Sequence, residues 1–165
     1  MRYFLVAGEA SGDLHASALI RALRAEDPEA SFAFMGGDKM EAAAGVSPIV
    51  HYREVAFMGI VSVVKNLGKL TRIGRQIQAA MRDFAPDVVI PVDYADFNFR
   101  FILPYAKGEL RCPVIYYILP KLWAWRAGRI RQLRRYVDLG LSILPFETSY
   151  FSDRGLRTEY IGNPC

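Results

Sequence analysis

Two short segments place carboxylates where a parallel sheet would present them to a ligand. Glu9 lies in GEASGDLHA (8–16), after an apolar run, and Asp93 lies in VDYADFNFR (92–100), after the run DVVIPV. In an open α/β sheet the carboxyl ends of the strands face the ligand crevice. A carboxylate there can take a proton from an attacking substrate hydroxyl within hydrogen-bond reach. Asp93 is therefore the candidate general base. Glu9, beside a helix N-terminus, is a candidate acid or hydrogen-bond acceptor.

The polar neighbours of these carboxylates have simpler interpretations as well. Ser11 and Asp13 are candidate N-caps of a first helix, and Ser11 is also a candidate substrate contact. Asp96 is the better candidate to cap a helix that starts near Phe97, which leaves Asp93 for chemistry. Asn98 follows as a candidate substrate contact. The glycine segment fits neither GxGxxG nor GxxxxGK, so neither NAD nor ATP binding is predicted.

Both tryptophans of the chain stand in one tetrapeptide, WAWR (123–126). Trp123 and Trp125 follow a predicted strand and Pro120, and they precede an arginine-rich helix. A flat aromatic pair beside Arg126 and Arg129 could hold a substrate that carries both apolar and anionic groups. The alternative is that the tryptophans pack on the sheet.

The segment 56–84 reads as two joined helices with different surfaces. The first is apolar almost all round, which is typical of a deeply buried or a lipid-contacting helix. Its apolar residues are Phe57, Met58, Ile60, Val61, Val63 and Val64, and the basic residues beside them are Lys65, Lys69 and Arg72. This combination suits reversible binding to an anionic membrane surface. The alternative is a core helix with a solvated basic face. The second helix has a regular stripe that we assign to the core: Leu67, Leu70, Ile73, Ile77, Met81 and Phe84.

Short β-branched runs alternate with longer segments of helical period. The predicted strands are 3–7, 31–35, 88–92, 114–118, 139–143 and 158–161. The predicted helices are 13–24, 38–44, 57–84 in one or two pieces, 97–107, 123–136 and 147–153. Near-continuous apolar strands between helices indicate a parallel sheet covered on both faces. The sequence therefore predicts one Rossmann-like, doubly wound α/β domain over 1–165.

Composition narrows the class of protein and its partners. Apolar residues make up 52% and charged residues 23% of 165, as in a globular protein, and no apolar run is long enough to span a bilayer. His15 and His51 are isolated and taken as structural, and Cys112 and Cys165 lack metal spacing, so we expect no metal and no cofactor in a reducing, cytoplasmic setting. Two basic stretches, 55–82 and 110–137, contain no acidic residue and indicate an anionic partner. Nucleic acid is the less favoured anionic partner, because binding to RNA would not require the apolar patch at 57–64.

Six motifs together resemble one enzyme family, in its order and along the whole chain. They are GEASGDLH (8–15), AFMGIVSVV (56–64), PDVVIPVDYADFN (86–98), WAWRAGR (123–129), ILPFE (143–147) and YIGNP (160–164). The chain resembles the N-terminal half of lipid-A-disaccharide synthase. The resemblance implies a GT-B, inverting glycosyltransferase of lipopolysaccharide biosynthesis. Such an enzyme joins UDP-2,3-diacylglucosamine to 2,3-diacylglucosamine 1-phosphate and releases UDP.

The resemblance also implies roles for particular residues. Asp93 corresponds to the family's general base for the acceptor's 6-hydroxyl, Glu9 to its glycine-loop carboxylate, and the helix 57–67 to its membrane-contacting, acyl-chain-receiving surface. The UDP-sugar donor would bind a second domain absent from this chain, the acylated sugar phosphate acceptor would bind this half, and the enzyme would lie on the cytoplasmic side of the inner membrane. The chain departs from the family pattern at Ala95, Lys121 and Asn163. Another GT-B protein or a nucleotide-sugar epimerase is the alternative.

Overall fold

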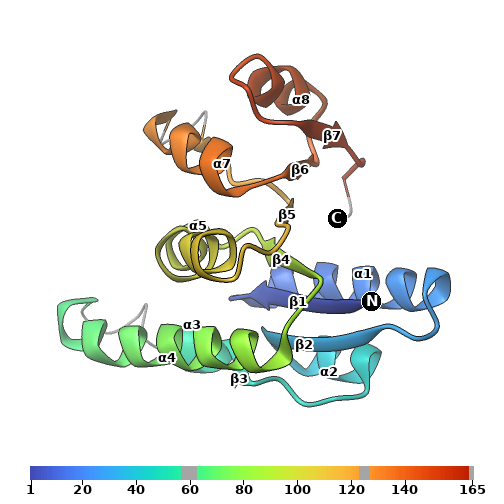
Figure 1. Ribbon diagram of the computed structural model, residues 1–165, viewed down its shortest axis with the longest axis vertical. Coiled ribbons are helices and arrows are strands. Elements are labelled where there is room, and N and C mark those ends of the chain that lie inside the picture. The colour runs from blue at the N-terminus through green and yellow to red at the C-terminus, as the bar shows by residue number, and fades with distance from the viewer. Residues whose placement is uncertain (57–62, 123–126, 164–165) are drawn as a thin grey trace.

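A computed structural model describes residues 1–56, 63–122 and 127–163, and within them seven strands form one parallel sheet (Figure 1). The strands are β1 (Arg2–Ala7), β2 (Ser31–Gly36), β3 (Val50–His51), β4 (Val88–Val92), β5 (Ile115–Tyr117), β6 (Leu139–Ser142) and β7 (Thr158–Tyr160). Their order is β3-β2-β1-β4-β5-β6-β7. The six predicted strands are all present with small changes of boundary. Sequence reasoning missed β3, which at two residues is too short to show a period.

The helical segments lie between these strands. They are α1 (Ala10–Glu26), α2 (Asp38–Ala44), α3 (Tyr52–Ala56), α4 (Val63–Phe84), α5 (Ala95–Phe97), η2 (Asn98–Ile102), η3 (Tyr105–Glu109), η4 (Ala127–Arg129), α7 (Ile130–Tyr136) and α8 (Pro145–Ser152). Two of them, η2 and η3, are π-helical and continue α5.

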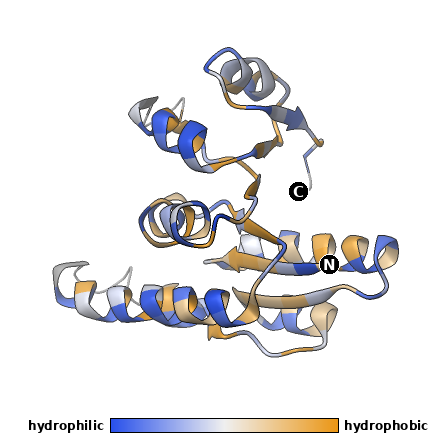
Figure 2. Cartoon of the chain, in the orientation of Figure 1, coloured by the Kyte–Doolittle hydropathy of each residue, from blue (hydrophilic) through white to orange (hydrophobic). Residues whose placement is uncertain are grey.

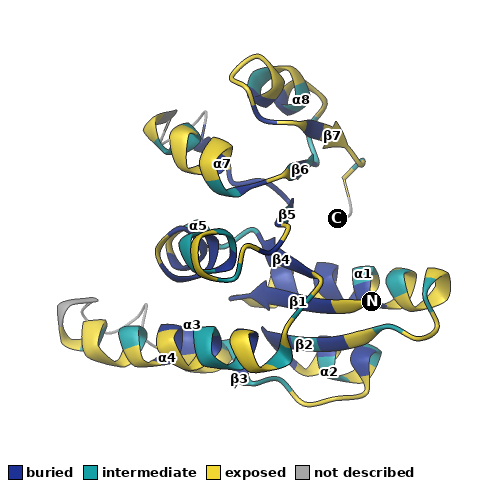
Figure 3. Ribbon diagram, viewed as in Figure 1, coloured by how far each residue is buried: buried dark blue, intermediate teal, exposed yellow. Residues whose placement is uncertain are grey.

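Each face of the sheet is covered, so the domain is doubly wound. Successive side chains of a strand point to opposite faces. In β1, Phe4 and Val6 belong to one buried cluster with residues of α4, η2 and α7, and Leu5 and Ala7 belong to a second cluster with residues of α1 and α2. The central strands β1, β2 and β4 are largely apolar and buried, whereas β7, at the edge of the sheet, exposes Glu159 and Tyr160 (Figures 2 and 3). The chain winds outward from β1 in one direction and from β4 in the other. The switch point of the topology therefore lies between β1 and β4.

Two predicted helix caps are wrong. Helix α1 begins at Ala10, so Ser11 and Asp13 lie inside it. Asp13 instead accepts hydrogen bonds from the backbone N–H groups of Gly37 at 2.9 Å and Met40 at 3.0 Å, which caps α2 from a neighbouring helix. Asp96 lies within α5, whose N-cap position is Tyr94 and has no side-chain cap.

The apolar stripe of α4 is only partly in the core. Ile73, Ile77 and Met81 are buried, as predicted. Leu67, also assigned to the core, is 40% exposed, which corrects that prediction. The reason is position, because the first turns of α4 project beyond the strands (Figure 1). Among the described residues, no helix combines the length and the apolar character needed to cross a bilayer.

Candidate functional site

A cleft of about 380 Å³ opens at the switch point of the sheet. Its walls come from the first turns of α1, from the loops after β4 and β5, and from the end of β6. The lining residues are Ser11, Gly12, His15, Asp93, Ala95, Ile118, Leu119, Pro120, Lys121 and Ile143. The fold thus brings Asp93 and Leu119, which follow β4 and β5, beside Ser11 and Gly12 of the glycine segment.

The backbone of Asp93 is held in an unusual conformation. Asp93 and Tyr94 have φ of 43° and 46°, the left-handed region that non-glycine residues rarely adopt. Three hydrogen bonds maintain it. The hydroxyl of Tyr116 and the Nδ2 of Asn98 donate to the Asp93 carbonyl at 2.6 Å and 2.8 Å, and the Asp93 N–H donates to the carbonyl of Tyr117 at 3.1 Å. Strained backbone that its surroundings enforce in this way is concentrated at functional sites.

The glycine at the start of the first loop is required by this same turn. A Cβ built on Gly8 would lie 2.1 Å from the ring of Tyr94. The ring therefore lies directly against the backbone at the end of β1. This contact ties the loop after β1 to the loop after β4, and only glycine permits it.

Burial raises the pKa of the Asp93 carboxyl above its ordinary value, and the negative charge of Glu9 raises it further. The Tyr94 N–H, Lys121 and His15 oppose that shift, in decreasing order. Glu9 is exposed, and its Oε1 accepts a hydrogen bond from the Ser11 hydroxyl at 3.4 Å. A carboxylate with a raised pKa, half-buried in a cleft, is suited to accept a proton.

Two titratable residues of the cleft, His15 and Lys121, were not among the site residues predicted from the sequence. His15 was taken as structural, yet it lines the cleft with only 8% of its surface exposed. Its spacing of four residues from Ser11 on one helix was the available signal, since such residues share a face. Lys121, noted as a departure from the family pattern near the site, is exposed and also lines the cleft.

Asn98 is fully buried, and its amide supports the Asp93 carbonyl. It therefore contributes to the site by holding Asp93. Several predicted contacts lie outside the described residues: Trp123, Trp125, Arg126, Phe57, Met58, Ile60 and Val61. Val63 and Val64 lie in α4 with side chains that are likewise outside the description.

A second concave surface, which we call the α4–α7 groove, lies beside the cleft and has about 570 Å³. Its lining is Leu67, Leu70, Tyr94, Asp96, Phe97, Phe99, Arg100, Phe101, Arg129 and Gln132. Arg129, predicted to bind substrate, forms an ion pair with Asp96 at 2.8 Å, and its guanidinium lies 5.1 Å from the centre of the Phe99 ring. The residues 94–97 separate this groove from the cleft.

The groove continues into a shallower depression with a basic border. Leu67 and Arg100 belong to both hollows, and Thr71, Arg72 and Arg75 extend the second one along α4. Lys65, Lys69 and Arg72 are exposed on the same helix. Apolar and cationic surfaces are therefore adjacent at this end of the molecule.

Comparison with protein families identifies the chain. A family model described as lipid-A-disaccharide synthetase matches residues 3–165. The lipid-A-disaccharide synthase of Myxococcus xanthus is 44% identical over 163 residues, which cover 99% of this chain and 42% of that protein. The enzyme of the same name from Alkalilimnicola ehrlichii is 38% identical over 165 residues, which cover 100% of this chain and 42% of that protein. The chain thus spans less than half the length of these relatives.

Solved structures share the fold at low sequence identity. UDP-GlcNAc 2-epimerase from Neisseria meningitidis, bound to UDP-GlcNAc, superimposes with a TM-score of 0.69 and 14% identity over 99% of this chain and 46% of that one. Anabaena Alr3699/HepE, in complex with UDP-glucose, gives a TM-score of 0.61 at 14% identity, covering 99% and 44%. The fold is the Rossmann-like half found in GT-B proteins, and the match over residues 3–165 shows that this chain belongs to the lipid-A-disaccharide synthase family.

Proposed function

We propose that this chain is the acceptor-side half of a glycosyltransferase of lipid A biosynthesis. The enzyme would join UDP-2,3-diacylglucosamine to 2,3-diacylglucosamine 1-phosphate and release UDP. Family membership supports the reaction class. The observation that carries the proposal is the placement of Asp93, a half-buried carboxyl with a raised pKa, on a strained turn at the switch-point cleft.

Asp93 acts as the general base in this proposal. Its carboxylate accepts the proton of the acceptor's 6-hydroxyl while that oxygen attacks the anomeric carbon of the donor. The new glycosidic C–O bond forms, the bond from the anomeric carbon to UDP breaks, and UDP leaves with the electron pair. Attack opposite the leaving group inverts the anomeric carbon. A raised pKa favours this role because a base is most effective when its pKa approaches the working pH.

A second domain would supply the nucleotide-sugar site. The chain covers 42% of the Myxococcus xanthus relative, and the two neighbours named above as complexes with UDP-sugars are each matched over less than half of their length. We propose that residues 1–165 bind the acylated sugar phosphate and that the donor reaches the cleft from the other half. Glu9 and Ser11, at the rim, are the residues of this chain placed to meet it.

The α4–α7 groove would face the membrane that holds the lipid substrates. Its apolar lining can accept acyl chains, and Lys65, Lys69 and Arg72 can contact anionic headgroups at about 1 kcal/mol each. The groove lies next to the cleft, so an acceptor could keep its chains in apolar surroundings while its sugar reaches Asp93. We propose peripheral binding to the cytoplasmic side of the inner membrane.

The test is turnover of the full-length enzyme that carries this domain, with paired variants. Asp93→Asn keeps the shape of the side chain and removes its basicity, so we expect turnover to fall by about 10²- to 10⁴-fold with little change in acceptor binding. Asp96→Asn removes the exposed carboxylate of the ion pair with Arg129 and should change turnover by less than about threefold. Near-normal turnover of Asp93→Asn, or a larger loss of turnover for Asp96→Asn, would show that Asp93 is not the base.

A further inference from the structure

A histidine forms part of the same cleft as the candidate base. His15 lies in the second turn of α1, and Asp93 lies in the loop after β4. Both side chains line the 380 Å³ cleft, and only 8% of the surface of His15 is exposed. A charge on a side chain so enclosed is weakly screened by water and salt, so it acts more strongly on its neighbours than an exposed charge does.

The charges around Asp93 fall into two opposing sets. Burial and the Glu9 carboxylate disfavour the ionised form of Asp93, whereas the Tyr94 N–H, Lys121 and His15 favour it. The carboxylate of Asp13, on the same helix as His15, is directed to the N-terminus of α2. Two more distant charges, Asp96 and Arg129, are paired with each other.

The two cationic groups differ in how firmly they are placed. Lys121 is exposed on a loop, so salt screens its ammonium and its long side chain can swing away. His15 is fixed by the packing of α1 against the sheet.

We propose that His15 is a positioning residue that, in its imidazolium form, keeps the Asp93 carboxylate ionised and ready to accept the hydroxyl proton. This inference rests on the proposed role of Asp93. Loss of the imidazolium leaves burial and Glu9 opposed by the Tyr94 N–H and Lys121 alone, so Asp93 holds its proton to a higher pH. Activity is then lost first at acid pH, where the base is protonated.

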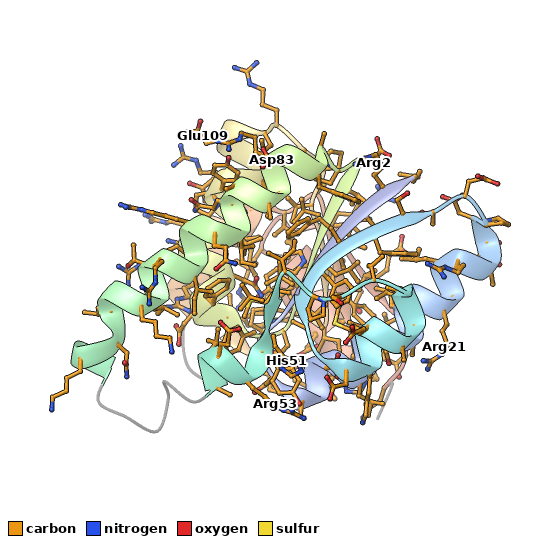
Figure 4. The ribbon with its side chains drawn as sticks, turned by 90° about the horizontal axis from the view of Figure 1, so that it is seen from below. Arg2, Arg21, His51, Arg53, Asp83 and Glu109 are labelled. Carbon is orange, nitrogen blue, oxygen red and sulfur yellow. The ribbon has the colours of Figure 1, made fainter. Side chains whose placement is uncertain are left out.

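The first experiment needs no turnover and uses the 165-residue chain itself. The side-chain carboxyl resonance of Asp93 is followed by carbon-13 NMR through a pH titration. His15→Gln should raise the pH at which Asp93 titrates, and Glu9→Gln should lower it. His51→Gln is the matched control, because His51 lies away from the cleft, bonded to Asp38 at 3.0 Å and placed beside Arg53 (Figure 4). An unchanged Asp93 titration in folded His15→Gln overturns the inference.

A second measurement covers the case in which His15→Gln does not fold. In the parent chain, the Asp93 carboxyl resonance should show a second, smaller inflection at the pH where the ring of His15 titrates, because the two sites are coupled. This inflection should persist in about 0.5 M salt, where exposed charges such as Lys121 are screened. A single-step titration of Asp93, with no inflection in common with His15, overturns the inference.

The closing experiment is the pH profile of kcat/KM for the full-length enzyme. His15→Gln should lower kcat/KM by about three- to tenfold on the acid side, with a loss that shrinks as the pH rises, while His51→Gln leaves the profile in place. A uniform loss at all pH values indicates a merely structural role and overturns the inference.

The NMR titration and the pH profile together separate this inference from the proposed function. If the NMR titration of Asp93 shifts and the acid limb of the profile does not, Asp93 is not the base, and the proposed function fails together with the catalytic part of this inference. If Asp93→Asn is inactive and His15→Gln changes neither the NMR titration of Asp93 nor the acid limb of the kcat/KM profile, the proposed function stands and the proposed role of His15 is wrong.

Discussion

The switch-point cleft and the α4–α7 groove lie on either side of residues 94–97, yet they are built in different ways. The cleft is made by loops that follow strands, and its polar groups are held by hydrogen bonds to strand residues. The groove is made between helices, and its lining is aromatic and aliphatic with arginines at the border. The first is suited to place a reactive group accurately. The second is suited to accept a flexible apolar ligand.

Stability and accuracy are distributed differently as well. In the cleft, two consecutive left-handed residues, Asp93 and Tyr94, are maintained by contacts from β5, from the end of β1 and from η2. In the groove, Leu67 is partly exposed and Arg100 lies at a surface. Substitutions in the cleft should therefore act on turnover, and substitutions in the groove on partition to a membrane. The predictions below test that separation, from the largest expected effect to the smallest.

Gly8→Ala should have the largest effect. The new Cβ would lie 2.1 Å from the Tyr94 ring, so the turn that carries Asp93 must move. Displacement of a catalytic group by about 1 Å can lower turnover by about 10²-fold, and we also expect a loss of about 1 to 3 kcal/mol in the free energy of unfolding. Gly108→Ala is the matched control, because a Cβ there meets nothing within 4 Å. Equal turnover of the two variants would show that the Tyr94 contact is dispensable.

Tyr116→Phe should have an intermediate effect. It removes the hydroxyl that donates to the Asp93 carbonyl at 2.6 Å and leaves the donor from Asn98 in place. We expect kcat to fall by about tenfold with KM nearly unchanged, and the free energy of unfolding to fall by about 1 kcal/mol. Tyr3→Phe, at the opposite end of the sheet, loses a hydroxyl whose recorded contact is the sulfur of Met1, and should lose little. A rise in KM with an unchanged kcat would contradict the positioning role.

The sequence predicted the cleft better than the groove, for a physical reason. A parallel sheet brings the ends of its strands to one edge, so Asp93 could be placed at the crevice from the strand pattern alone. Helix packing follows no such rule. Leu67 continues the apolar period of α4 yet is exposed, and Arg129 of η4 meets Asp96 of α5 only through the tertiary fold.

Errors within the cleft arose from contacts between elements distant in sequence. Asp13 has the residue type and position of a local cap, but its partners are the N–H groups at the start of α2, more than twenty residues away. His15 was assigned to structure because it has no partner at metal-ligand spacing. The group that makes it relevant, Asp93, comes from another strand. Local spacing contains neither piece of information.

Groove variants should weaken membrane binding about fivefold and leave the fold intact. Arg72→Gln removes one exposed cation, worth about 1 kcal/mol at an anionic surface, and the loss should shrink in high salt. Arg21→Gln is its control, because Arg21 projects from α1 on the other side of the molecule (Figure 4). Leu67→Ser, compared with Leu14→Ser on α1, tests the apolar part, since both leucines are exposed to a similar degree. The measurement is sedimentation with vesicles that contain anionic lipid. Equal binding by all four variants would remove the groove from the membrane contact.

The smallest expected effect is on stability, and it separates the chemical role of Asp93 from a structural one. The pKa of Asp93 is raised in the folded chain, so its favourable contribution to folding is present below the ordinary carboxyl pKa and is lost as the pH rises through the raised value. Asp93→Asn cannot ionise and escapes that loss. The free energy of unfolding of Asp93→Asn, relative to the parent, should therefore be higher near pH 7 than near pH 3, by about 1 kcal/mol or less because the group is partly exposed. Urea unfolding of both chains at the two pH values measures this difference, and Asp96→Asn should not show it in the same direction. If the free energy of unfolding of the parent instead rises relative to that of Asp93→Asn with increasing pH, the ionised carboxyl stabilises the fold, and the cleft does not raise the pKa of Asp93.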